Sequence, residues 1–253
     1  MKRANHNKLP ASYEDFRLAS QDLTLSDAER IGFSEHVREG YEAKILQDWE
    51  AKIPALNETG KWILDVGCGA SKLTDLLMEK AQRKKHSLFL SDSDEVLSSL
   101  KSAMSAVLVP GKFPASAKTI TEKAGRPFDI VICYSVLQYP FAEGQLLPFV
   151  DALFLLLGRG GTLLLGDIPN ASKRIRFLQS ETGRLYHQKH FPNSPAPSLR
   201  EFQKNERREM NDTVVRDLWL RYREHGAETY LLPQDSDLPL ANRREDLLIV
   251  KSR

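Results

Sequence analysis

The sequence has few features of secreted, membrane or metal-binding proteins. Only two cysteines occur among its 253 residues, and neither Cys68 nor Cys133 has the spacing of a zinc site or a disulfide framework. No apolar run approaches the roughly 20 residues needed to cross a bilayer. Residues 1–11 are polar and basic, without the apolar core of a signal peptide. We therefore expect a cytoplasmic protein that holds no metal and enters no membrane.

An excess of charge of one sign is also missing. The formal net charge is +2, which does not favour a nucleic-acid coat or a membrane surface as partner. No appended RNA-binding module is visible, so a nucleic-acid substrate is the weaker option. A chain of this length can form one α/β domain with appendages and bury its core without disulfides.

A glycine-rich turn between a strand and a helix is the most informative feature present. Residues 62–66 form a short apolar run of strand type, Gly67 and Gly69 follow at once, and apolar residues at helical spacing begin after Lys72. Glycines accept positive φ and let backbone N–H groups and a helix N-terminus face a ligand. The dinucleotide fingerprint GxGxxG fails, because Lys72 stands where its third glycine belongs.

The turn fits a different pattern, acid-x-Gly-x-Gly, as Asp65-Val66-Gly67-Cys68-Gly69. It resembles the glycine loop of class I S-adenosylmethionine (SAM) methyltransferases, although Ser71 replaces a glycine that the family often has. The resemblance spans about residues 61–170 and 211–251. It implies SAM as cofactor, S-adenosyl-L-homocysteine (SAH) as product, and cofactor contacts from the loop residues Asp65, Gly67, Cys68 and Gly69.

The order of elements predicts the fold class. Strand-like runs alternate with helical segments at 62–66, 87–90, 106–109, 128–133 and 162–165, which implies a parallel sheet with crossover helices. Residues 228–232 and 246–251 add a closing antiparallel hairpin, as in the family. We therefore expect a Rossmann-like α/β fold with a seven-stranded, mostly parallel sheet and helices on both faces.

The second and third strands end in residues that suit an adenosine. Asp92 follows the second strand directly, and one carboxylate there can accept hydrogen bonds from both ribose hydroxyls. The alternative is that Asp92 caps the next predicted helix, 95–104, although Ser93 or Asp94 could equally cap it. Ser93 is also counted as a cofactor contact. Lys112 replaces an acidic residue that the family often places near the adenine, so Phe113 is the expected adenine contact.

The tips of the fourth and fifth strands supply the candidate catalytic residues. The resemblance implies that Tyr134 and Ser135 face the reaction centre, with Tyr134 both contacting the cofactor and orienting the substrate. Asp167 follows the fifth strand, at the edge where open α/β sheets bind ligands. Asp167, His187 and His190 are the candidate general bases. Asp167 could instead cap the following loop, and each histidine could be an ordinary surface or lid residue.

Two segments flank this domain, residues 61–253. Residues 1–60 are predicted to form a helical N-terminal cap, in which apolar residues recur every four positions along a helix over 34–53. That stripe either packs on the following domain or closes over the cofactor. Residues 171–211 interrupt the alternation and are predicted to be an inserted substrate lid. Residues 171–210 hold nine Lys or Arg against four Glu.

Together these features predict a SAM-dependent methyltransferase (EC 2.1.1.-) that acts on an O or N atom of a small, anionic metabolite. The basic lid suits phosphate or carboxylate groups, such as those of a sugar or nucleotide-sugar in surface-carbohydrate biosynthesis. The alternatives are a catalytically silent partner protein with the same fold, or an RNA methyltransferase. A homodimer is left open.

Overall fold

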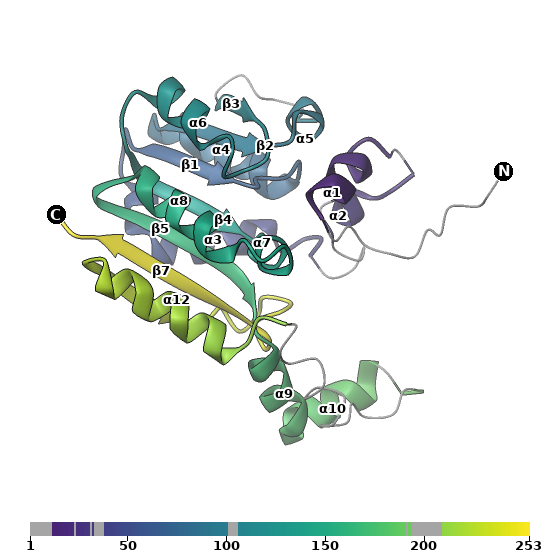
Figure 1. Cartoon of the computed structure of the whole chain (residues 1–253). Coiled ribbons are helices and arrows are strands. Elements are labelled where there is room, and N and C mark those ends of the chain that lie inside the picture. Colours follow the sequence, from purple (N-terminus) through teal and green to yellow (C-terminus); the bar gives the residue numbers. More distant parts are fainter. Residues whose placement is uncertain are drawn as a thin grey trace.

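The computed structural model describes residues 12–22, 24–30, 32, 38–100, 106–190, 192–193 and 209–253. Its centre is a seven-stranded sheet in the order β3-β2-β1-β4-β5-β7-β6 (Figure 1). The strands are β1 (Trp62–Val66), β2 (Ser87–Asp92), β3 (Ala106–Pro110), β4 (Phe128–Tyr134), β5 (Leu157–Pro169), β6 (Ala227–Leu232) and β7 (Arg244–Lys251). Strands β1 to β5 pair in parallel, whereas β7 runs antiparallel to its neighbours β5 and β6. The predicted seven-stranded, mostly parallel sheet with a closing antiparallel hairpin is confirmed.

Helices cover both faces of this sheet, as predicted (Figure 1). They are α1 (Tyr13–Ala19), α2 (Asp27–Arg30), α3 (Glu42–Lys52), the 3₁₀ helix η1 (Pro54–Asn57), α4 (Lys72–Lys84), α5 (Asp94–Ser98), α6 (Ala117–Ala124), α7 (Gln138–Ala142), α8 (Leu146–Leu156), α9 (Ala171–Gln179), α10 (Glu181–His190) and α12 (Asp212–Glu224). None of the helices in this described part of the chain is long and apolar enough to cross a membrane.

The core is divided between the two faces by the alternation of side chains along each strand. Leu64 and Val66 of β1 join one apolar cluster, which contains the buried residues of α6, α8 and α12. Ile63 joins the other cluster, to which α3 contributes Ile45 and Trp49 and to which α4 also contributes. Helix α3, although N-terminal to the first strand, is therefore one of the helices that cover the sheet.

The N-terminal helix is shorter than predicted. The expected helix covered 34–53, but α3 begins at Glu42, and residues 38–40 form a bend and turn. Gly40 has a φ of 87°, a left-handed conformation that an α-helix cannot include. Residues 33–37, with the predicted helical position Val37, lie outside the described residues. Residues 101–105, the predicted end of the helix after β2, lie outside them too.

The segment predicted to be a lid leaves the sheet directly after β5. Its first part forms α9 and α10, which lie beyond the end of β5, whereas α1 and α2 lie beside the carboxyl ends of β1, β2 and β4 (Figure 1). Residues 191 and 194–208, which include much of the predicted lid, are outside the described part of the chain. The carboxyl edge of the sheet thus has one set of helices near β1 and β4 and another near β5.

Candidate functional site

A cavity of about 310 Å³ lies at the carboxyl edge of the sheet, within the size range of small-molecule sites. The tips of β1, β2 and β4 and the loop after β3 form one side of it. The N-terminal segment forms the other side, with lining residues Tyr13, Phe16, Arg30 and Arg38. None of the described residues of the predicted lid lines this cavity. The N-terminal segment is therefore what covers the site in the described structure.

The glycine loop lines the cavity in the conformation that its sequence predicts. Gly67 and Gly69 have φ values of 73° and 62°, which only glycine adopts without strain. A Cβ atom on Gly67 would lie 2.5 Å from Cγ2 of Val136, far inside van der Waals contact. The Gly67 N–H donates to the carbonyl of Ser91, 2.8 Å away. The turn is thus packed tightly between the tips of β2 and β4.

Asp92 joins the tip of β2 to this loop. Its Oδ2 accepts a hydrogen bond from the Gly69 N–H at 2.9 Å, and its Oδ1 accepts one from the Ser93 N–H at 2.7 Å. Asp92 does not cap α5, because the Ser93 hydroxyl accepts the bond from the Val96 N–H. The capping alternative for Asp92 is therefore wrong. Asp92 lines the cavity, whereas Ser93 does not.

Two further groups of the loop have raised pKa values, which favour their protonated forms. Burial and the neighbouring charge of Asp92 raise the pKa of Asp65 to about 7, against the opposing effect of Arg38. Burial, with the charges of Asp92 and Asp65, raises the pKa of the Cys68 thiol well above its usual value. Both residues line the cavity. A cation brought next to Asp65 would be stabilised by its carboxylate form.

The end of the cavity near β3 is apolar and aromatic. Phe113 lines it and packs edge-to-face against Phe149, with ring centroids 5.0 Å apart. Pro114 and Val96 line the same cavity. Flat apolar surfaces of this kind suit a planar ring such as a purine base, and they lie on the same side of the sheet edge as Asp92.

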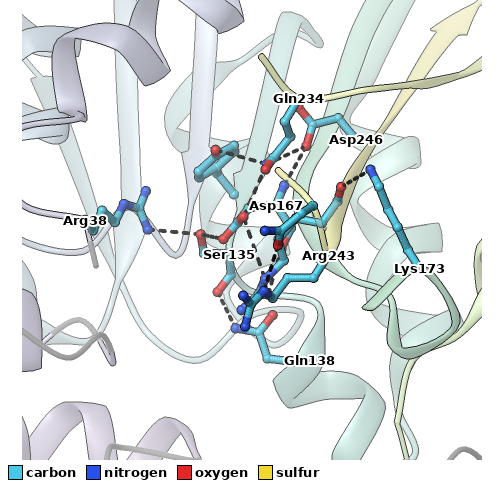
Figure 2. A network of polar contacts seen from close by, with 11 residues as sticks. Arg38, Ser135, Gln138, Asp167, Lys173, Gln234, Arg243 and Asp246 are labelled. Atoms are coloured by element: carbon cyan, nitrogen blue, oxygen red, sulfur yellow. Dashed lines mark hydrogen bonds and ion pairs between the residues drawn. The ribbon is translucent and has the colours of Figure 1, made fainter. Parts of the chain in front are cut away.

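The tips of β4 and β5 form a polar network at the other end (Figure 2). The Ser135 hydroxyl donates to Oδ2 of Asp167 at 2.6 Å and accepts a bond from Nη1 of Arg38 at 3.0 Å. The Gln234 amide lies within hydrogen-bonding distance of Oδ1 of Asp167, 3.2 Å away, and of the Tyr134 hydroxyl, 3.3 Å away. Of this network, Arg38, Tyr134 and Ser135 line the main cavity.

Tyr134 is enclosed on several sides. The Arg38 guanidinium lies 5.1 Å from the centre of its ring, and Trp49 packs against the ring edge-to-face at 5.2 Å. Burial and the charges of Asp167 and Asp246 raise the pKa of its hydroxyl well above the usual value. The side chain is therefore a neutral phenol, which can orient a ligand by hydrogen bonding but does not act as a base near neutral pH.

The structure brings most of the predicted site residues together. Those that line the one cavity are Asp65, Gly67, Cys68, Gly69, Asp92, Phe113 and Tyr134. Asp167 is buried, does not line the cavity, and is hydrogen-bonded to Ser135, which does. His187 lies on α10 and does not line the cavity, so the structure does not group it with the other candidates.

Comparison with known proteins found similar structures but no similar sequence family. No protein-family model matches the sequence, and no curated protein matches it. Among solved structures, the plantazolicin methyltransferase BamL, in complex with a triazolic desmethylPZN analog and SAH, is 15% identical. The TM-score is 0.58, and the match covers 95% of this chain and 97% of BamL.

Two other solved structures agree. The N-methyltransferase NodS from Bradyrhizobium japonicum WM9, in complex with SAH, is 13% identical with a TM-score of 0.55, covering 96% of this chain and 100% of NodS. The CurJ carbon methyltransferase is 13% identical with a TM-score of 0.57, covering 92% of this chain and 59% of CurJ. This chain has the class I methyltransferase fold. At such low identity, the likeness concerns the fold and not the acceptor.

Two residues of the site of this methyltransferase fold were not singled out from the sequence. Arg38 lies within the helix predicted over 34–53, where a charged residue is expected to face solvent. Gln234 lies in the loop between β6 and β7, and nothing in its sequence neighbours marks it. Both reach the network by contacts across the fold, with Arg38 bonded to Ser135, 97 positions away, and Gln234 to Tyr134, 100 positions away.

The packing of the glycine loop gives a first prediction. We expect Gly67→Ala to lower the free energy of unfolding by about 1–3 kcal/mol more than Gly125→Ala does. Both glycines have a positive φ, 73° and 68°, so both variants place alanine at a similar left-handed φ. Only a Cβ at Gly67 meets Val136, whereas the space around Gly125 is open. Urea unfolding of the two variants measures the difference, and equal midpoints would contradict the close approach.

Proposed function

We propose that this protein is a SAM-dependent methyltransferase that transfers a methyl group to an oxygen or nitrogen atom of a small, anionic acceptor. The observation that carries the proposal is the cavity shared by a glycine turn, the acidic tip of β2 and the tip of β4. The fold that the chain shares with BamL and NodS, both solved with SAH, supports it.

The residues of the cavity fit SAM from end to end. The Asp92 carboxylate would accept hydrogen bonds from the two ribose hydroxyls, and Phe113 would face the adenine ring. Asp65, whose burial and proximity to Asp92 disfavour its charge, would gain a partner in the ammonium group of the cofactor. Gly67 lines the cavity with backbone alone. Tyr134 would then orient the groups at the transfer end.

SAM supplies an electrophilic methyl group on a positively charged sulfur, which is already a good leaving group. The protein therefore contributes mainly alignment, which can supply about 7 kcal/mol or more of the barrier reduction. The N-terminal segment provides one wall of the cavity, and this wall would limit the access of water to the transfer end. A base is needed when the acceptor is a hydroxyl or a protonated amine.

The anionic character of the acceptor rests on the cations near the transfer end. Arg30 and Arg38 line the cavity, and Arg38 reaches Ser135. Arg244 does not line the cavity, but its Nε lies 3.9 Å from Oδ1 of Asp167. The planar guanidinium of arginine can donate two parallel hydrogen bonds to a carboxylate or phosphate group. A phosphorylated or carboxylated sugar, including a nucleotide-sugar of surface-carbohydrate biosynthesis, has this chemistry.

Calorimetric titration with SAH tests the cofactor assignment. We expect a dissociation constant on the order of micromolar for SAH and no binding of NAD, because the third glycine of the dinucleotide motif is absent. In Asp92→Ala the affinity for SAH should fall by about tenfold or more, since a charge-assisted contact to the ribose is lost.

Asp92→Asn serves as the matched variant, because it removes the charge and keeps one oxygen that can still accept from the Gly69 N–H, although its amide nitrogen replaces the oxygen that accepts from the Ser93 N–H. We expect it to bind SAH with an affinity between those of the unchanged protein and Asp92→Ala. A folded, unchanged protein that does not bind SAH would instead support the silent partner protein.

The raised pKa of Asp65 predicts a pH dependence of SAH binding. The carboxylate form is the one that pairs with the ammonium group, and it is lost as the pH falls below about 7. Over about pH 5.5 to 7.5 SAH keeps its ammonium charge, so its affinity should fall toward acid pH by up to about tenfold per pH unit. Asp65→Asn should bind more weakly and lose most of this slope. The same slope in both proteins would contradict the role of Asp65.

A further inference from the structure

Ser135 and Asp167 share an unusual backbone conformation at neighbouring strand tips. Their φ values are 62° and 55°, in the left-handed region that costs most residues other than glycine about 1–2 kcal/mol. The Ser135 N–H donates to the carbonyl of Gly166, which precedes Asp167, at 3.0 Å. A strained backbone conformation persists where surrounding contacts stabilise it, and such conformations are common at functional sites.

Figure 2 shows the hydrogen bonds around Ser135, and the chemistry of the groups sets the direction of each bond. An ionised carboxylate cannot donate, so the short contact of 2.6 Å to Oδ2 of Asp167 uses the hydroxyl proton of Ser135. The Arg38 guanidinium can only donate hydrogen bonds, so its contact of 3.0 Å occupies one lone pair of the Ser135 hydroxyl. A hydroxyl oxygen has two lone pairs, and Ser135 lines the main cavity. The second lone pair can accept a proton from a ligand there.

A carboxylate is a stronger base than a hydroxyl, but the carboxylate of Asp167 does not line the main cavity, whereas the hydroxyl of Ser135 does. Its side chain is buried and lines a small second pocket next to Arg38 and Gln234 rather than the main cavity. Gln234 and Arg244 both contact its Oδ1 side, and its Oδ2 is bonded to Ser135. The Ser135 hydroxyl therefore provides a hydrogen-bonded connection between the main cavity and Asp167.

We propose that Ser135 is a catalytic residue of the methyl transfer, which accepts the proton of the acceptor and passes its own proton to Asp167. This inference rests on the proposed function. The acceptor O or N atom forms a bond to the methyl carbon while the carbon–sulfur bond breaks and its electron pair stays on sulfur. The proton of the acceptor moves to Oγ of Ser135, and the Oγ proton moves to Oδ2 of Asp167. After the product leaves, Asp167 returns the proton to solvent.

This relay narrows the acceptor to groups that lose a proton as they are methylated. A hydroxyl or an N–H nucleophile needs such a route, whereas a tertiary amine or a thioether has no proton to give. Arg38 contacts the same hydroxyl and would offset negative charge that develops on Oγ in the transfer. The anionic group of the acceptor would then bind near Arg38, and the group that receives the methyl would lie beside it at Ser135.

Sinefungin tests this arrangement without knowledge of the acceptor. It is the SAM analogue in which an amine-bearing carbon replaces the methylated sulfur, so its ammonium lies where the methyl group would be. That ammonium can donate to Oγ of Ser135, whereas SAH has no group there. The ratio of the dissociation constants of SAH and sinefungin, measured by calorimetry, reports the contact.

We expect the unchanged protein to prefer sinefungin by about tenfold or more, the effect of a hydrogen bond with a charged group. Ser135→Gly should remove most of this preference and change SAH affinity by less than about twofold. Glycine is chosen because it keeps the left-handed backbone without strain. Asp167→Asn should also reduce the preference, because the negative charge behind Ser135 is lost, and asparagine tolerates this conformation.

Ser236→Gly is the matched control. Ser236 also lies beside an aspartate, with its Oγ 3.5 Å from Asp237, but that pair is exposed and outside the cavity, so the preference should not change. A Ser135→Gly protein that still prefers sinefungin as the unchanged protein does would overturn the relay and leave the cofactor site standing. Failure of the unchanged protein to bind SAH would overturn the proposed function, and this inference with it.

Discussion

One buried carboxylate connects the parts of the molecule that meet at the transfer end. Asp246 of β7 is fully buried, and its Oδ2 accepts a bond from the ammonium of Lys52, on α3, at 2.6 Å. Its Oδ1 accepts the backbone N–H of Asp167 at 2.8 Å and lies 3.1 Å from the Gln234 amide. Burial raises the pKa of Asp246, and the charge of Lys52 opposes that effect. A buried carboxylate is retained only where such partners compensate its lost hydration.

The consequence of that carboxylate is the geometry of Asp167. Because its N–H is bonded to Asp246, the chain turns through a left-handed residue as β5 passes alongside β7, where the pairing register of the two strands shifts. The side chain of Asp167 is thereby aimed across to β4 and Ser135. Lys52 ties α3 to the same point. The N-terminal segment, the last strand and the transfer end are thus held together by one set of polar contacts.

The cavity has two chemically different ends as a result. Near β2 and β3 it offers an acid, Asp92, and aromatic surface from Phe113, which are groups that bind and orient without reacting. Near β4 and β5 it offers hydroxyls and a guanidinium in a network that can hold or move a proton. The glycine loop follows β1, which lies between β2 and β4 in the sheet, and Gly67 and Gly69 let the backbone there approach one extended ligand that contacts both ends.

The sequence predicted the features that are local in the chain. The glycine turn, the alternation of strands and helices, and Asp92 at a strand tip each depend on a few adjacent residues and their spacing. The parts that escaped prediction depend on long-range contacts. The start of α3 is set by the turn at Gly40 within an otherwise helical pattern, and Arg38 gains its role by reaching Ser135. His187 was chosen for its residue type alone, and no spacing relates α10 to the sheet edge.

The most direct test of this account is a crystal structure of the protein grown with SAH. We predict that SAH occupies the cavity with its ribose on Asp92, its ammonium next to Asp65 and its sulfur facing Tyr134 and Ser135. That arrangement would place the methyl group of SAM at the Ser135 hydroxyl, in front of Asp167. SAH bound outside the cavity, or bound within it with its sulfur turned away from Ser135, would contradict the account.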